Sequence, residues 1–381
     1  MKKVLYISPF WPVQSGISEY SEILLQGLKQ YYQISLLINN YKVEHVEKLR
    51  EFEIYQSTEY INFNQYNCLI YNFGNNPEAH DYMYDLFLDH PGIVILHDFS
   101  LYYLTIEHYR KKGNHLQKIY KMEGVPGIVY LKESIKEYPD PNLLLHKELA
   151  AVLPMNDEII KNAEKILIHS SYTQNEIVKK FPEAKTHVIP LVNCMPSINL
   201  NANFDLRKKF NIPENEQIIG SAGLIGPSKQ CELCCQSILE YNKTHKQKKH
   251  YVMIGDGDYV DSYLGKYIHK TGFLKNEDFF AAIEQCDMIF NLRYPYNGES
   301  SATLLQCMML KKTCIVTDIG WFSELSDEIV FKIPIQISYI ELAAKIDTFA
   351  QDKEKSIKAY QYSSTVCSAD SVAKEVYALI N

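Results

Sequence analysis

Hydroxyl-bearing and charged residues gather in the last third of the chain, between two apolar runs. Residues 288–292 form a short apolar run that predicts a buried strand, and a loop with Gly298 follows it. Ser300 and Ser301 stand just before a second apolar run, 304–310, which predicts a helix. The first amides of a helix have no partner within the helix. A strand, a glycine loop and a helix start therefore make an anion-binding site from the backbone.

Two charged side chains flank this predicted anion site. The carboxylate of Glu299 can accept two hydroxyl hydrogen bonds, and the guanidinium of Arg293 can offer a fork of donors to phosphate. With the backbone amides of Ser300, Ser301 and Ala302, they indicate a pocket for a sugar joined to a nucleotide diphosphate. The alternative is that Glu299 is only a helix-terminal charge that the helix dipole favours.

A second set of residues that can hold phosphate lies earlier in the chain. The apolar run 217–222 leads into a loop that opens on Gly223, and Lys229 stands where the next helix begins. There an ammonium group can reach a diphosphate that backbone amides already hold, although an ordinary surface lysine is the alternative. Gly272, in the segment 269–274, offers backbone groups to the base of a nucleotide.

The elements that must position these residues are predicted to form two α/β domains. A chain of 381 residues is too long for one ordinary core, and short apolar runs alternate along it with amphipathic segments. This alternation is typical of parallel, doubly wound sheets. A polar stretch over 191–203 indicates a domain boundary. We therefore expect domains at 1–195 and 196–365, followed by a helix-bearing segment at 366–381.

A histidine and an aspartate mark a candidate site in the first domain. His97 and Asp98 directly follow the apolar run 92–96, at the C-terminal end of a predicted strand. A lone histidine is more often packed or solvated than catalytic. Ligands approach that edge of open α/β sheets, however, so the position favours a functional role.

The segment 109–145 has a loose pattern with several glycines and prolines. Long irregular stretches inside compact domains tend to be lids or binding loops, so it predicts a loop that binds the acceptor. Its tyrosines, Tyr120 and Tyr130 among them, can stack on sugar rings or lie at a membrane surface, and ordinary packing is the default.

Composition and charge exclude several classes of protein. The net charge of −7 argues against a general nucleic-acid binder. The sequence shows no signal peptide and no apolar run of membrane-spanning length, which predicts a cytoplasmic protein. The nine cysteines are odd in number and scattered, as expected in a reducing compartment.

Two patterns resemble metal sites. Cys231 and Cys234 have the Cys-x-x-Cys spacing, but no second pair at ligand spacing is evident, so a buried helix face is the preferred interpretation. Gly255-Asp-Gly-Asp258 carries two carboxylates, which alone do not make a Mg²⁺ site. We therefore predict no metal.

The motifs together resemble those of family 4 glycosyltransferases, which have the GT-B fold. The resemblance rests on four segments: Pro-Val-Gln-Ser-Gly at 12–16, Leu-His-Asp-Phe-Ser at 96–100, Asn-Leu-Arg-Tyr-Pro-Tyr-Asn-Gly-Glu-Ser-Ser-Ala at 291–302, and Thr-Asp-Ile-Gly-Trp-Phe-Ser-Glu-Leu at 317–325. It implies two Rossmann-like domains that face a cleft. The N-terminal domain would bind the acceptor, the C-terminal domain would bind the donor, and the last helix would cross back to the first domain.

The resemblance also implies roles for single residues. His97 would contact the transferred sugar, and Asp98 would orient the imidazole or touch the acceptor. Lys229 would bind the donor phosphates, Glu299 the ribose, and the loop of Gly16 would lie near the phosphates. Retention of the anomeric configuration is likewise an implication of the resemblance.

Two positions depart from the family pattern. Leu224 stands where the family brings an arginine to the donor phosphates, and Gln306 stands near the place of a second glutamate. We expect Arg293 or the helix amides at 300–302 to substitute for the missing arginine charge.

The expected activity is transfer of a hexose from a UDP- or GDP-linked sugar to a glycan or lipid-linked glycan, in the synthesis of a surface polysaccharide or glycoconjugate. It needs no cofactor and no nucleic acid, and a lipid-linked acceptor implies peripheral contact with the inner face of the plasma membrane. Two alternatives remain open. One is a nucleotide-sugar 2-epimerase, and the other is a non-catalytic partner subunit.

Overall fold

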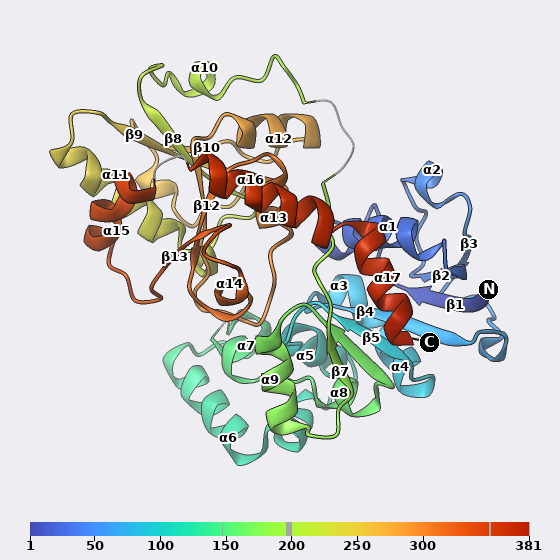
Figure 1. Ribbon diagram of the computed structural model, residues 1–381. Coiled ribbons are helices and arrows are strands. Elements are labelled where there is room, and N and C mark those ends of the chain that lie inside the picture. The colour runs from blue at the N-terminus through green and yellow to red at the C-terminus, as the bar shows by residue number, and fades with distance from the viewer. Residues whose placement is uncertain (147, 196–199, 350–351, 381) are drawn as a thin grey trace. The chain divides into compact units, whose positions relative to one another are not determined.

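The computed structural model describes residues 1–146, 148–195, 200–349 and 352–380. It divides into two compact units, each with its own sheet (Figure 1). Unit 1 comprises Met1–Val192, Asn297–Ser300 and Ser368–Asn381, and unit 2 comprises Asn193–Tyr296 and Ser301–Cys367. Residues 196–199 of the predicted boundary lie outside the described residues. The short segment Asn297–Ser300, which carries Glu299, thus belongs to unit 1 although the chain on both sides of it belongs to unit 2.

Unit 1 is built on a seven-stranded sheet with the order β3-β2-β1-β4-β5-β6-β7. All neighbouring strands pair in parallel, as the apolar runs predicted. The strands are β1 (Lys2–Ile7), β2 (Tyr32–Ile38), β3 (Glu53–Gln56), β4 (Cys68–Phe73), β5 (Ile93–Leu96), β6 (Lys165–Ile168) and β7 (Thr186–Val188). Because the strands are parallel, the loops that follow them all leave from one edge of the sheet.

The helices of unit 1 include one that returns from the far end of the sequence. They are α1 (Gly16–Leu28), α2 (Val46–Leu49), α3 (Pro77–His80), α4 (Tyr84–Asp89), α5 (Tyr102–Lys111), α6 (His115–Glu137), α7 (Leu149–Val152), α8 (Asp157–Asn162), α9 (Ser171–Lys180) and α17 (Ala369–Ile380), with short 3-10 turns η1 (Phe63–Gln65), η2 (Asp81–Met83) and η3 (Leu143–Leu145). Helix α17 packs on α1 so closely that a Cβ added at Gly27 would lie 2.6 Å from the Cβ of Ala373. Tyr377 also stacks on Tyr31, with ring centroids 4.5 Å apart.

The prediction of a long loop over 109–145 is wrong, because most of this segment is helix α6. Its buried positions include Ile119, Met122 and Leu131, and its other side is rich in lysine and glutamate, which are good helix formers. The glycine and proline signals mark a kink instead. Gly124 has φ 66° and ψ −155°, outside the helical region, and Pro126 follows it.

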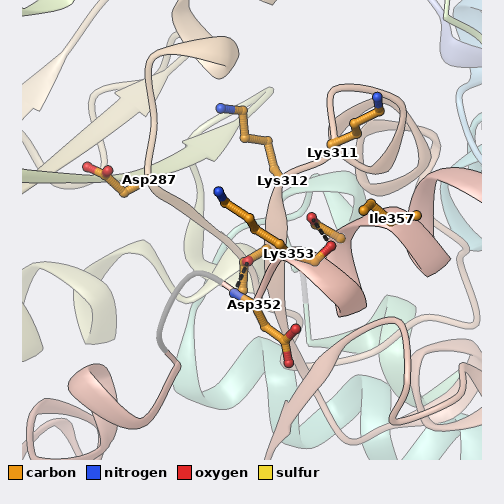
Figure 2. Close-up of a pocket in the computed structure, with 8 residues that line it drawn as sticks. Asp287, Lys311, Lys312, Asp352, Lys353 and Ile357 are labelled. Carbon is orange, nitrogen blue, oxygen red and sulfur yellow. Dashed lines mark hydrogen bonds between the residues drawn. The ribbon is translucent and has the colours of Figure 1, made fainter.

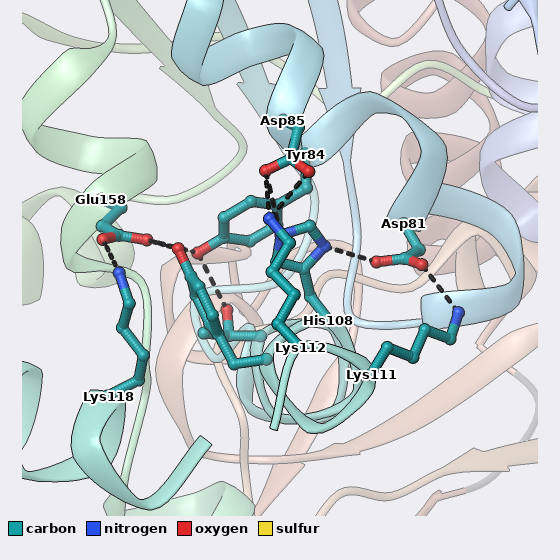
Figure 3. Close-up of polar contacts among 10 residues, drawn as sticks. Asp81, Tyr84, Asp85, His108, Lys111, Lys112, Lys118 and Glu158 are labelled. Atoms are coloured by element: carbon teal, nitrogen blue, oxygen red, sulfur yellow. Dashed lines mark hydrogen bonds and ion pairs between the residues drawn. The ribbon is translucent and has the colours of Figure 1, made fainter. Parts of the chain in front are cut away.

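Charged side chains fasten α5 and α6 to the rest of unit 1 (Figure 3). His108 of α5 lies with its Nδ1 2.7 Å from a carboxylate oxygen of Asp81. On α8, Glu158 accepts a hydrogen bond from the hydroxyl of Tyr109 and pairs with the ammonium of Lys118 at 2.5 Å. The inner side of α6 is thus held by ion pairs as well as by apolar packing.

Unit 2 is built on a six-stranded parallel sheet with the order β10-β9-β8-β11-β12-β13. Its strands are β8 (Gln217–Ala222), β9 (Lys249–Ile254), β10 (Ile268–Lys270), β11 (Met288–Asn291), β12 (Thr313–Thr317) and β13 (Phe331–Ile333). Its helices are α10 (Leu206–Phe210), α11 (Cys231–Thr244), α12 (Asn276–Glu284), α13 (Ala302–Met309), α14 (Gly320–Glu324), α15 (Tyr339–Lys345) and α16 (Lys353–Gln361), with the short turns η4 (Pro227–Lys229), η5 (Asp261–Tyr263), η6 (Ile346–Phe349) and η7 (Tyr362–Val366). The two parallel sheets confirm the predicted α/β class.

The cysteine pattern on α11 is a packing pattern. Cys231, Cys234 and Cys235 are buried in the core of unit 2. Burial raises the pKa of the Cys234 thiol well above its usual value, so it stays a neutral, apolar group. Across residues 1–146, 148–195, 200–349 and 352–380, no helix is both long and apolar enough to cross a bilayer.

Candidate functional site

The loops after β8 and β11 bring Gly223, Lys229 and the start of α13 together in unit 2. Gly223 has φ 95°, and a Cβ added there would lie 2.7 Å from Nζ of Lys229 and 3.9 Å from Oγ1 of Thr303. The ammonium of Lys229 also donates to the carbonyl of Ala222 at 3.3 Å. One glycine is therefore bordered by a lysine ammonium and by the first turn of a helix.

The first turn of α13 has the features of an anion site. Ser301 caps the helix, since its hydroxyl accepts from the amide of Leu304 at 3.2 Å. Ala302 is the first residue of the helix, where amides point out of the N-terminus. The helix dipole and the ammonium of Lys229 both favour a negative group here, which suits a diphosphate.

Arg293 lies in the same region but turns its guanidinium inward. Its side chain is mostly buried, donates to the carbonyl of Leu292 at 2.7 Å, and lies 5.7 Å from the ring centroid of Phe322. The next amide, that of Tyr294, donates to the carbonyl of Ser228 at 2.8 Å. The backbone beside Arg293 thus joins two loops of unit 2, and the guanidinium packs against Leu292 and Phe322 of the same unit.

The glycine-rich turn after β9 supports the loop of Gly223. A Cβ added at Gly255 would lie 2.0 Å from the carbonyl oxygen of Gly223, so only glycine fits. The amide of Ile225 donates to the carbonyl of Asp256 at 2.8 Å. The third loop of this edge holds Gly272 at φ 75°, where an added Cβ would meet no atom within 4 Å. Gly272 therefore borders open space beside these turns.

The two departures from the family pattern have different surroundings. Leu224 is 78% exposed, directly after Gly223. Gln306 is buried and donates from Nε2 to the carbonyl of Cys194 at 3.1 Å, so it ties α13 to the start of unit 2. This hydrogen bond gives the glutamine at position 306 a structural role.

A second group of predicted residues lies at the edge of the sheet in unit 1. His97 follows β5, and its amide donates to the carbonyl of Phe73 at 2.9 Å. Its Nε2 lies 3.2 Å from Oδ1 of Asn72, and its ring meets the edge of Tyr20 at 4.5 Å between centroids. Burial, followed by the nearby charge of His169, lowers the pKa of His97 well below its ordinary value. The imidazole is therefore neutral at pH 7.

The carboxyl group of Asp98 has a raised pKa. Its Oδ2 accepts a hydrogen bond from the amide of Asn75 at 2.8 Å. Burial, opposed by the hydrogen bond from the Asn75 amide and reinforced by the carboxylate of Glu299, raises the pKa of Asp98 to about 6. Asp98 can thus change protonation near neutral pH.

Glu299 reaches unit 1 because the segment Asn297–Ser300 packs there. Gly298 has φ 84°, and a Cβ added to it would lie 2.4 Å from the Cβ of Phe99. The hydroxyl of Thr173 donates to the carbonyl of Gly298 at 3.3 Å, and Oε2 of Glu299 accepts from the amide of Asn297 at 2.9 Å. Glu299 and Ser300 thus belong to unit 1, the unit that also holds His97 and Asp98.

Gly16 begins α1, on the same edge of unit 1. The hydroxyl of Ser15 caps this helix by accepting from the amide of Ile17 at 3.2 Å. A Cβ added at Gly16 would meet no atom within 4 Å, so this position needs no glycine for packing. The first turns of α1 contribute to the site through Tyr20, which contacts His97.

Three residues that surround His97 were not predicted as site residues, although the strand that ends in His169 resembles the family strand that closes the nucleotide-facing edge of the first domain. Asn72 lies near the end of β4, His169 follows β6, and Tyr20 lies on α1, all at the same edge of the sheet. For Asn72 and His169, the signal that finds them is a polar residue at the end of an apolar run, whereas Tyr20 lies inside a helix and carries no such signal.

Replacing Asp98 by asparagine should raise the free energy of unfolding at pH 7 and leave it unchanged near pH 4. Between its ordinary value of 3.8 and about 6, folded Asp98 holds a proton that the unfolded chain releases, so stability falls as the pH rises through this window. Asparagine removes that loss, which is about 3 kcal/mol for a shift from 3.8 to about 6. Denaturant unfolding at both pH values measures it, with Asp89→Asn on an exposed position as the control. A gain of equal size at pH 4 would contradict the assignment.

A separate cavity of about 320 Å³ lies in unit 2 (Figure 2). Asp287, Lys312 and Thr313 line it at the starts of β11 and β12, the opposite edge of the sheet from the predicted donor residues. Its charged groups have structural partners: the ammonium of Lys312 donates to the carbonyl of Cys286 at 3.0 Å, and a carboxylate oxygen of Asp287 accepts from the amide of Ile218 at 2.7 Å. We assign it no role in catalysis.

Comparison with known proteins identifies the fold. No family model matches the chain. Sucrose-phosphate synthase of Thermosynechococcus elongatus is 11% identical with a TM-score of 0.62, over 100% of this chain and 98% of that one. HepE of Anabaena, solved with UDP and glucose, is 14% identical with a TM-score of 0.62, over 100% and 99%. WaaG, described as a glycosyltransferase involved in lipopolysaccharide biosynthesis, is 10% identical with a TM-score of 0.58, over 99% of each chain.

One curated relative matches part of the sequence. A lipopolysaccharide 1,2-N-acetylglucosaminetransferase of Salmonella typhimurium is 24% identical over 136 residues, which is 34% of this chain and 34% of that protein. The match therefore spans about a third of the relative. The full-length structural likenesses, together with the parallel sheets of seven and six strands, show that the chain has the GT-B fold.

Proposed function

We propose that the chain is a retaining glycosyltransferase that moves a hexose from a nucleotide diphosphate sugar to a hydroxyl of a glycan or lipid-linked glycan, in the synthesis of a surface polysaccharide or glycoconjugate. The observation that carries this proposal is the meeting of Gly223, Lys229 and the first turn of α13. Backbone amides, a helix dipole and an ammonium are what a diphosphate requires. The UDP and UDP-glucose bound by the Anabaena neighbour support a nucleotide-sugar donor.

The proposed reaction breaks the bond between the anomeric carbon and the diphosphate oxygen, and it forms a bond from that carbon to the acceptor oxygen. Negative charge grows on the leaving diphosphate oxygen as its bond breaks, and this oxygen takes up the proton that the acceptor hydroxyl gives up. Lys229 and the α13 N-terminus stabilise that charge electrostatically. His97 contacts the transferred sugar, Asp98 the acceptor, and Glu299 accepts hydrogen bonds from donor hydroxyls. No step of the proposed reaction uses a metal or a cofactor.

The function is tested by a thermal-shift panel of UDP, GDP, ADP, dTDP and their sugars, followed by a transfer assay with the donor that binds. A ligand that binds the folded state raises the melting temperature. A rise with one nucleotide, and transfer of its sugar to an acceptor, is the expected result. Interconversion of the donor without an acceptor would instead show a 2-epimerase.

A non-catalytic partner subunit is the second candidate, and Leu224 is the observation that favours it. An exposed leucine stands in the donor loop directly beside Gly223, where the family pattern brings an arginine. Nucleotide binding with no turnover of any sugar donor would select this candidate. Introducing the charge by Leu224→Arg should then restore detectable hydrolysis of the donor, which a competent enzyme would not need.

A lipid-linked acceptor requires contact with a membrane, and we propose that α6 provides it. Tyr120 and Tyr130 of this helix are 60% and 46% exposed, and Val125 and Val129, which lie between them in the sequence, are 64% and 46% exposed. Tyrosines combine an apolar ring with a polar tip, and such side chains favour the headgroup region of a bilayer. Other positions of α6, such as Ile119, are buried within unit 1, and we propose that its exposed side chains contact lipid.

The double variant Tyr120→Ser/Tyr130→Ser should bind vesicles of anionic phospholipid about tenfold more weakly, because each serine removes apolar area that lipid would bury. Co-sedimentation measures the bound fraction. Tyr60→Ser is the matched control, since Tyr60 is 90% exposed elsewhere in unit 1. Equal binding by all three proteins would show that α6 is not the membrane-contacting face.

A further inference from the structure

We propose that Asn72 is a positioning residue that fixes the imidazole of His97 in one tautomer, with the proton on Nε2 and the lone pair of Nδ1 left for a ligand. The proposal rests on the proposed function only for the identity of that ligand, a hydroxyl of the transferred sugar. The tautomer itself can be measured without any substrate.

Paired strands hold the two side chains in register. Asn72 of β4 stands opposite Ile95 of β5, and the amide of His97 donates to the carbonyl of Phe73 at 2.9 Å. This backbone pairing places Oδ1 of Asn72 3.2 Å from Nε2 of His97. An amide oxygen can only accept a hydrogen bond, so Nε2 must carry the proton that it donates.

Buried hydroxyl groups contact the side-chain amide of Asn72. Its Oδ1 also lies 3.3 Å from the hydroxyl of Tyr6, which lies 3.2 Å from the hydroxyl of Ser21. Ser21 in turn lies 2.7 Å from the hydroxyl of Ser8. All four side chains are buried, where a hydrogen-bonded network is worth more than in water. The hydrogen bonds that link Tyr6, Ser21 and Ser8 therefore help to hold the oxygen of Asn72 beside the imidazole.

Because the His97 ring is neutral, its tautomer decides which ring nitrogen donates a hydrogen bond and which one accepts. Burial and the nearby His169 and His80 lower the pKa of His97 well below its ordinary value. A neutral imidazole has a single N–H, and here Asn72 takes it. Because the ring of His97 is partly exposed while Nε2 is engaged, Nδ1 is the nitrogen left for a ligand. A bare nitrogen accepts a hydrogen bond. His97 therefore selects a hydroxyl group of the sugar and repels the phosphate oxygens, which offer no proton.

The direct test is the ¹⁵N NMR signal of His97 in the full chain, identified by its loss in His97→Gln. We expect a protonated Nε2 and a bare Nδ1 in the parent, and a mixture of tautomers in Asn72→Ala. Asn67→Ala is the matched control. Asn67 immediately precedes the same strand, and its side chain accepts from the amide of Lys3 at 2.8 Å at the far end. A proton on Nδ1 in the parent, or an unchanged tautomer in Asn72→Ala, overturns the proposal.

A binding comparison separates this inference from the proposed function. Asn72→Ala should lower kcat/KM for the nucleotide sugar roughly tenfold, the effect of one lost hydrogen bond to the sugar. It should leave the melting-temperature rise caused by the sugar-free nucleoside diphosphate unchanged, because that ligand has no sugar hydroxyl of the transferred hexose to donate to Nδ1. An equal loss with both ligands overturns the sugar-specific role. If the tautomer is as stated and no donor binds at all, the proposed function fails and the role of Asn72 stands.

Discussion

Replacing Lys229 by methionine should lower sugar transfer by about 10²- to 10³-fold, the usual effect of removing one group that stabilises charge in a transition state. Methionine keeps the length and apolar stem of lysine but removes the ammonium, which borders Gly223 and the first turn of α13. The rise in melting temperature caused by the nucleotide should disappear as well, since the same group holds the diphosphate in the ground state. The measurement is kcat/KM together with the thermal shift.

Lys246→Met is the control for this experiment, because Lys246 is an exposed lysine of the same unit, outside the loops of the candidate site. Methionine keeps the volume of the lysine stem, and the ammonium's hydrogen bond to the carbonyl of Ala222, at 3.3 Å, is one weak contact, so the variant should still fold. Its melting temperature without ligand checks this. A Lys229→Met protein that binds and transfers normally would remove Lys229 from the donor site and would weaken the proposed function with it.

Gly298→Ala should cost about 10²-fold in transfer while leaving the protein folded. The left-handed φ of 84° disfavours any side chain, and the added Cβ would lie 2.4 Å from the Cβ of Phe99. The segment Asn297–Ser300 must therefore move, and it carries Glu299 with it. A displacement of about 1 Å at a reacting centre has an effect of this size. The kinetic constants measure the loss, and denaturant unfolding should show a decrease of about 1–3 kcal/mol.

Two comparisons make the Gly298 prediction specific. Gly265→Ala is the control, since an added Cβ there would meet no atom within 4 Å and its φ is not left-handed. If Gly298 acts by placing Glu299, then adding Gly298→Ala to a Glu299→Gln protein should cost little more than Glu299→Gln alone. If the loss of activity in the double variant equals the product of the losses in the two single variants, Gly298 acts through groups other than Glu299.

The sequence predicted the sheets well because their signal is local. Apolar runs such as 93–96 and 288–291 form buried parallel strands, and polar residues directly after them must lie at the C-terminal edge. Strand β3 escaped prediction because Glu53 and Gln56 give it no apolar run. The glycines at 113, 124 and 127 suggested a loop, yet one helix accommodates the last two through a kink at Gly124.

The sequence could not show contacts between distant segments. Asn72 and His97 are separated by 25 residues, and only the pairing of β4 with β5 brings them together. Likewise the guanidinium of Arg293 lies 5.7 Å from the ring centroid of Phe322, which is 29 residues away in the sequence. Side-chain direction depends on these tertiary contacts, which local patterns do not contain.

The discontinuous make-up of unit 1 has a consequence for how the protein is made in the cell. Its sheet and most of its helices come from the first 192 residues, but α17 and the segment Asn297–Ser300 are synthesised much later. During translation, α17 is not yet present to pack on α1. The face of α1 around Gly27 therefore stays exposed while the ribosome synthesises unit 2. An exposed apolar helix face is a site for aggregation or for a chaperone. Unit 2 should thus be able to finish folding first, and unit 1 should reach its native stability only after the ribosome has released α17.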